Sequence, residues 1–114
     1  MPQVRRWYIG LCRGRVRCNY HWDAINNQSV VLISASEGDT AIGDISSSAV
    51  PDRFVGNANF TVRNIAPYGT NRDGDERPGG VRFVIDVGWD ERLPTWADIV
   101  LLDEVPQGFS VSDS

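Results

Sequence analysis

The stretch Val81–Glu104, VRFVIDVGWDERLPTWADIVLLDE, carries the strongest structural pattern in the chain. Apolar residues alternate with other residues through its first half, which places one apolar set on a single face of a strand: Val81, Phe83, Ile85, Val87 and Trp89. After a break that contains Pro94, a second apolar run covers residues 99–102. We therefore expect a hairpin-like unit that supplies the central pair of strands of a β-sheet.

The N-terminal region shows the same period of two. Residues 5–11 and 16–22 each alternate, and Gly14-Arg15 between them has the composition of a type II′ turn. This turn would set the pairing so that Leu11 lies opposite Cys18, with the apolar side chains of both strands on one face. The pattern predicts an N-terminal hairpin with an apolar inner face and an arginine-bearing outer face.

The two cysteines fall on opposite faces of this predicted hairpin. Cys18 would point into the core and Cys12 outward, whereas a disulfide needs two side chains that are close and directed at each other. We therefore expect two free thiols, which agrees with a reducing compartment.

Three further short segments have strand character: residues 30–35, 40–46 and 59–65. Turn-forming residues recur every 8–12 positions along the chain, and we find no helical periodicity longer than about one turn. The 114 residues, 41% of them hydrophobic and 23% charged, fit one globular domain. The sequence predicts an all-β fold: a single domain over residues 1–114, with a polar tail at 109–114, built as an antiparallel β-sandwich or small β-barrel of six to eight short strands.

Charge is distributed unevenly along the chain. All eleven basic residues are arginine; the first 22 residues hold five of them and no acid, for a charge of +5. The remaining residues hold six arginines and fifteen acids, for a charge of −9, which gives the net charge of −4. A basic segment on an acidic body favours contact with itself or with another acidic protein, and we expect no nucleic-acid partner.

The longest polar stretch, residues 67–80, contains three clustered acids: Asp73, Asp75 and Glu76. Carboxylates at such spacing can bind calcium, but the twelve-residue calcium-loop pattern is missing and Arg72 and Arg77 flank the acids. We expect a solvated loop, with these acids as weak metal candidates, and no cofactor.

Catalytic chemistry has little support in the sequence. A histidine-dependent nucleophilic mechanism would have to use His21, the only histidine, and we expect this residue on a solvated sheet face beside Tyr8. We therefore lean against an enzyme.

Our leading hypothesis is a non-catalytic β-sandwich that acts by protein–protein contact. It would be a structural or accessory subunit of a homo-oligomer or of a larger assembly, for example a viral one. Two alternatives remain open: a ligand-binding module, for example for carbohydrate, and a small β-barrel enzyme without a recognisable motif. We expect a cytoplasmic or virion location, because no long apolar segment predicts a membrane span or a secretion signal. The candidate interface or ligand residues are Arg13, Arg15, Arg17, Tyr68 and Trp96, and we expect Trp96 in a connection because it follows Leu93-Pro94-Thr95.

Overall fold

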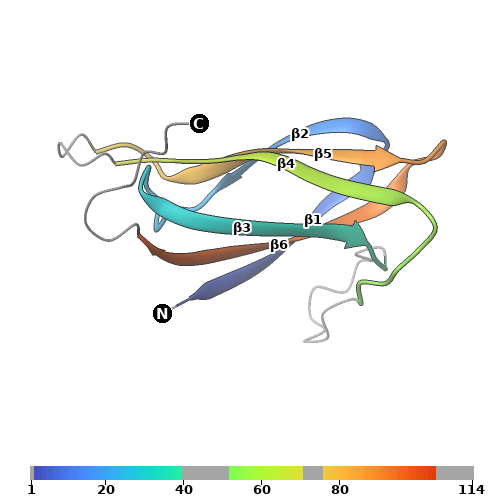
Figure 1. Cartoon of the computed structure of the whole chain (residues 1–114), viewed down its shortest axis with the longest axis horizontal. Helices are drawn as coiled ribbons and strands as arrows, with labels where there is room; N and C mark the ends of the chain where they lie inside the picture. The colour runs from blue at the N-terminus through green and yellow to red at the C-terminus, as the bar shows by residue number, and fades with distance from the viewer. Residues whose placement is uncertain (1, 40–51, 71–75, 105–114) are drawn as a thin grey trace, which may run out of the picture.

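The computed structural model describes residues 2–39, 52–70 and 76–104, which form two packed three-stranded antiparallel sheets (Figure 1). The six strands seen in this part of the chain are β1 (Gln3–Cys12), β2 (Gly14–His21), β3 (Ser29–Glu37), β4 (Asn59–Tyr68), β5 (Gly80–Gly88) and β6 (Leu93–Glu104). Sheet A has the order β1-β6-β3, and sheet B has the order β2-β5-β4. The all-β, antiparallel prediction is confirmed. The predicted strand at 40–46 and the tail at 109–114 lie outside the described residues.

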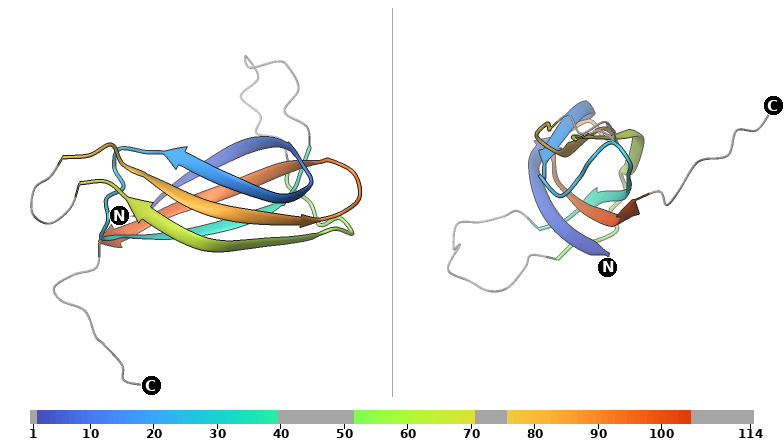
Figure 2. Two further views of the ribbon diagram at one scale, coloured as in Figure 1. Left: turned by 90° about the horizontal axis from the view of Figure 1, so that it is seen from above. Right: turned by 90° about the vertical axis from the view of Figure 1, so that its left-hand side faces the viewer.

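The core lies between the two sheets, and the right-hand view of Figure 2 looks along the strands of both. It contains the alternating residues predicted for β5, together with Ile99 and Leu101 from β6 and Trp22 and Ile25 from the segment between β2 and β3. Trp7, Ile9 and Tyr20 are half-buried and pack against this cluster. Trp89 follows the end of β5 and is exposed, so its predicted place on the inner face is wrong.

The predicted pairing of the two halves of Val81–Glu104 is also wrong. β5 is the middle strand of sheet B and β6 is the middle strand of sheet A, so the two strands face each other across the core. Each middle strand is apolar because it is covered by the opposite sheet, and this burial gives the same sequence pattern as a paired hairpin. β6 also begins earlier than expected, at Leu93, and Pro94 takes part in its pairing with β1.

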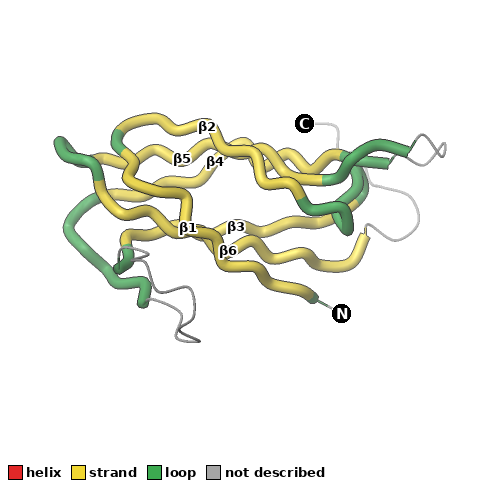
Figure 3. The backbone as a smooth tube through the Cα atoms, turned by 180° about the vertical axis from the view of Figure 1, so that it is seen from behind, coloured by secondary structure: helices red, strands yellow, loops and turns green. Residues whose placement is uncertain are grey.

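The predicted N-terminal hairpin does not form, because the chain passes from sheet A to sheet B between β1 and β2. β1 pairs with β6, and β2 pairs with β5 (Figure 3). Trp7 and Tyr20 still contact each other, with ring centroids 5.1 Å apart, but they come from opposite sheets. Alternation correctly identifies the inward side chains of both strands, although it does not determine whether they lie beside or across from each other.

A β-bulge in β1 reverses the predicted orientation of its last residues. The pairing with β6 shifts between Tyr8 and Gly10, and Gly10 has a φ of 123°, which favours glycine. After this extra residue Leu11 points outward, with 56% of its surface exposed, and Cys12 is buried. Both orientations are the opposite of those predicted.

No helix among the described residues is long and apolar enough to cross a membrane.

Candidate functional site: the outer face of sheet B

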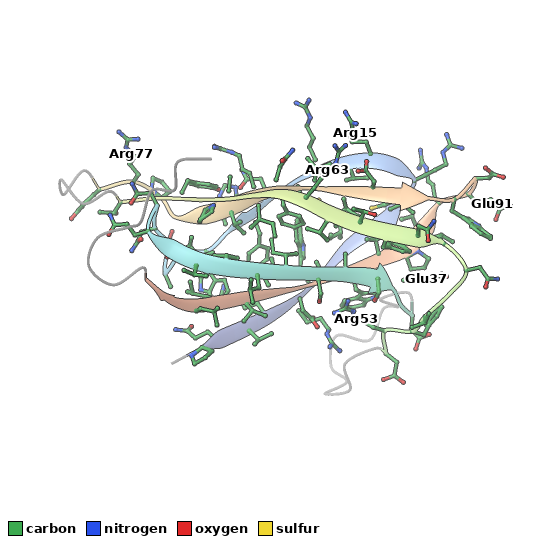
Figure 4. All side chains as sticks on the ribbon, viewed as in Figure 1. Arg15, Glu37, Arg53, Arg63, Arg77 and Glu91 are labelled. Carbon is green, nitrogen blue, oxygen red and sulfur yellow. The ribbon has the colours of Figure 1, made fainter. Side chains whose placement is uncertain are left out.

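Four arginines gather on the outer face of sheet B, on the side away from the core. They come from all three strands of the sheet: Arg15 and Arg17 from β2, Arg82 from β5 and Arg63 from β4. Their sequence neighbours on each strand point inward, so alternation directs these guanidinium groups to solvent. Figure 4 shows Arg15 and Arg63 rising from this sheet. We call this set of four side chains the arginine face.

A carboxylate in the middle of the arginine face neutralises it only in part. Asp86 on β5 lies 2.7 Å from Arg63, between Oδ2 and Nε, and 3.7 Å from Arg15, between Oδ1 and Nε. Arg17 and Arg82 have no carboxylate within ion-pair distance among the described residues. This face therefore keeps a positive charge in a chain whose net charge is −4.

A shallow notch of about 230 Å³ separates the two unpaired arginines. Val84 and Asn64 line it together with Arg17 and Arg82. It lies beside a bulge in β4, where the pairing with β5 shifts between Arg63 and Ala66 and Asn64 adopts a φ of 55°. The notch combines an apolar floor with two arginine walls, so it can receive an apolar side chain that has acidic neighbours.

A larger polar cleft of about 520 Å³ opens at the end of the same sheet, where β2 and β4 end and β5 begins. We call it the polar cleft. Its lining includes two prolines, a glycine and six polar side chains: Asn19, His21, Asn27, Tyr68, Arg77 and Arg82. Arg82 therefore borders both the notch and the polar cleft.

Tyr68 organises the polar cleft. Its hydroxyl group donates a hydrogen bond to Oδ1 of Asn19 and lies 3.4 Å from Nδ1 of His21. The guanidinium carbon of Arg82 lies 4.4 Å from the centre of the Tyr68 ring, which is a cation–π contact. His21 is thus solvent-exposed as predicted, but its aromatic neighbour is Tyr68 rather than Tyr8.

The remaining predicted site residues lie away from this face. Arg13 lies between β1 and β2, where it donates a hydrogen bond to the carbonyl oxygen of Asp90 at 3.2 Å. Trp96, expected in a connection, lies in β6 and is only 5% exposed. Its Nε1 donates to the carbonyl oxygen of Asp39 at 2.7 Å, and its ring packs against Tyr8 at 4.9 Å between centroids. These contacts support a packing role for Trp96.

Of the three acids considered as weak metal candidates, Asp73 and Asp75 lie outside the described residues, and Glu76 is exposed. No group of three or more potential metal-binding side chains occurs within residues 2–39, 52–70 and 76–104. Both cysteines are unbridged, as predicted, but both are buried, so the opposite-face placement on which that prediction rested is wrong. Burial raises the pKa of Cys18 to about 11, with a smaller contribution from Cys12, so this thiol stays protonated at neutral pH.

Sequence reasoning named Arg15, Arg17 and Tyr68 but missed Arg63 and Arg82. Alternation alone indicated that Arg82 points outward, but only the strand order shows that β2, β5 and β4 place the four arginines together.

Comparisons with protein-family models, curated proteins and solved structures found no match.

Proposed function

We propose that this protein is a non-catalytic binding module that acts by contact with an acidic surface of a protein, through the arginine face. The observation that carries the proposal is that Arg17 and Arg82, on either side of the notch, have no carboxylate partner in the part of the chain that the structure describes. Arginine recognises carboxylates through a planar fork of N–H groups, and it is enriched at protein interfaces. An acidic segment with one apolar side chain would fill the notch and pair with both guanidinium groups.

The arginine face also suits a partner that binds selectively rather than through net charge alone. Asp86 holds Arg63 and Arg15 from one side, so their guanidinium groups lie in a defined arrangement before any partner arrives. Attraction between exposed charges is screened over about 8–10 Å at physiological salt. Affinity would therefore come from apolar contact at the notch, and the charges would set orientation and association rate.

A second copy of this chain is one acidic protein that could supply such a surface. Exposed acids at the opposite end of sheet B from the polar cleft, Asp90 and Glu91, lie beyond the end of β5. The contact would join two different surfaces, so it would propagate into a ring or an open chain. This arrangement would make the protein a subunit of a homo-oligomer or of a larger assembly, as the uneven charge also suggests.

The test is a pair of matched double variants that remove the same charge. Arg15→Gln/Arg17→Gln alters the arginine face, whereas Arg13→Gln/Arg92→Gln alters exposed arginines at the turn after β1 and the loop before β6. Sedimentation equilibrium at low and high salt measures self-association, and titration with poly-L-glutamate measures binding of an acidic polypeptide. We expect the first variant to weaken poly-L-glutamate binding, and any self-association, far more than the second. Equal weakening by both variants would show that only net charge matters and would refute the proposal.

A further inference from the structure

We infer that the polar cleft is a binding site for a small phosphate monoester. This inference concerns a second ligand, at the end of sheet B beyond the notch, although Arg82 borders both the notch and the polar cleft. The volume of about 520 Å³ falls in the range of small-molecule sites. It exceeds what a phosphate group alone would need, so the site would also hold the organic part of an ester.

The lining of the polar cleft is cationic and rich in hydrogen-bond donors. Two arginines and one histidine line it, and two asparagine side chains add amide groups, while none of the lining residues within the described part of the chain is an acid. Phosphate oxygens accept hydrogen bonds only, and arginine binds them through two parallel N–H groups. The donor set therefore matches an oxyanion far better than it matches a cation.

The polar side chains of the polar cleft converge because Tyr68 holds them. The Tyr68 ring carries the guanidinium group of Arg82 on its face, and its hydroxyl group contacts both Asn19 and His21. Tyr68 is paired with Gly80 on β5, and a Cβ atom at Gly80 would collide with the Tyr68 hydroxyl group. The absence of a side chain at Gly80 lets the tyrosine lie across β5, which fixes the positions of groups from three strands before a ligand binds.

The same contacts argue against a carbohydrate in the polar cleft. A sugar ring would bind by stacking on an aromatic face, but Arg82 already covers a face of the Tyr68 ring. The ring therefore positions a cation and leaves the N–H groups of that cation available for the ligand. Among the described residues Arg82 has no carboxylate partner, so a phosphate group would provide its missing counter-charge.

The experiment is an NMR titration of the ¹⁵N-labelled chain with inorganic phosphate and glycerol 3-phosphate at constant ionic strength, with glycerol and acetate as controls. We expect saturable amide shifts at residues 19–21, 68–70 and 80–82, with glycerol 3-phosphate tighter than acetate by about tenfold or more, because a phosphate forms more charge-assisted hydrogen bonds. Two results would overturn the inference: shifts spread over all exposed arginines, or no saturation by about 10 mM ligand. That concentration is far above the dissociation constant of a specific charged site.

Variants assign the binding to individual groups. Arg82→Gln should weaken glycerol 3-phosphate about tenfold or more, because a bidentate charged contact is lost. Tyr68→Phe should weaken it by a smaller factor, since the ring that positions Arg82 remains. Arg92→Gln, an exposed arginine outside the polar cleft, should leave binding unchanged. Equal affinity in wild type and Arg82→Gln would refute the site.

Two further variants keep the test decisive. If Arg82→Gln does not fold, Arg82→Lys retains the charge and loses only the planar fork, so reduced affinity in this variant supports the inference and unchanged affinity contradicts it. Arg15→Gln/Arg17→Gln should leave glycerol 3-phosphate binding intact while it weakens binding of the acidic polypeptide. Failure of the phosphate site and failure of the proposed protein contact are therefore distinguishable.

Discussion

The outer faces of the two sheets both carry arginine and aspartate side chains, but they differ in how many of the arginines are paired with an acid. On sheet A, Asp98 binds Arg6 through two hydrogen bonds, of 2.8 and 3.1 Å, and Arg53 through one of 2.5 Å. Arg53 also donates to two serine hydroxyl groups on β3. On sheet B, Asp86 is shared by two arginines while two others have no acidic partner in the described part of the chain. The arginines of sheet A are thus paired within the fold, whereas Arg17 and Arg82 of sheet B keep guanidinium groups that no described acid neutralises.

The largest expected effect tests whether the two sheets contribute equally to the core. Ile85 in β5 and Ile99 in β6 are both fully buried, and each lies in the middle strand of its sheet. Replacing either by alanine should lower the free energy of unfolding by ~2–5 kcal/mol, because apolar burial is lost and a cavity remains. Urea unfolding followed by fluorescence measures both values. A loss below ~1 kcal/mol for one of them would show that its sheet does not share the core.

A smaller effect separates the two outer acids. Asp98→Asn should cost ~1–3 kcal/mol, because it weakens charged hydrogen bonds to two arginines at a partly buried carboxylate. Asp86→Asn should cost less than ~1 kcal/mol, because its ion pairs are more exposed. Both variants can be compared by urea unfolding at pH 7. Equal losses would contradict the distinction between the two faces.

The pH dependence of the free energy of unfolding tests the same distinction between the two outer faces. The hydrogen bond from Arg6, with a further contribution from Arg53, holds the pKa of Asp98 below its ordinary value despite partial burial. Because the folded-state pKa is lowered, the resulting stabilisation is present above the unfolded pKa and is lost as pH falls through the folded one. Melting temperatures between pH 7 and pH 2 should therefore fall less steeply in Asp98→Asn than in wild type. Parallel curves would show that Asp98 does not contribute to acid unfolding.

The smallest expected effect concerns the unpaired arginines. Arg17→Gln should change the free energy of unfolding by less than ~0.5 kcal/mol, because no partner in the described structure depends on it. Arg53→Gln should be clearly destabilising, since it removes contacts to Asp98 and to the hydroxyl groups of Ser34 and Ser36. Thermal unfolding compares the two variants. A destabilised Arg17→Gln variant would mean that the arginine face has a structural role.

Sequence patterns predicted the inward and outward faces of β2, of β5 and of β1 as far as its bulge, but not the neighbours of these strands. Ile85 and Arg82 were placed correctly because a half-buried strand alternates with a period of two. The pairing of β5 with β6 was wrong because a buried middle strand looks the same whether its apolar neighbour lies beside it or across the core. Leu11 was placed wrongly because the bulge at Gly10 adds one residue to the period, and a lone glycine does not reveal a bulge.

The candidate site was predictable only in part for the same reason. Arg15, Arg17 and Tyr68 were named from charge and loop position, whereas Arg82 joins them only through the order of strands in sheet B. Trp96 was assigned to a connection because Pro94 precedes it. In the structure β6 begins one residue before that proline, at Leu93. The carbonyl oxygen of Pro94 accepts a hydrogen bond from the backbone N–H of Gly38.

The strand order also determines how such a chain can fold. Of the six described strands, only β4 and β5 are both consecutive in the chain and paired with each other. β1 must wait for β6, since Gln3 pairs with Leu101 and Cys12 with Leu93. At a synthesis rate of ~5–20 residues per second, the ribosome would expose β1 for several seconds before its partner exists. We therefore expect folding on a millisecond-to-second timescale, as for other folds dominated by distant pairings. The positive charges of Arg5 and Arg6 would help to keep β1 from pairing with other chains during that interval.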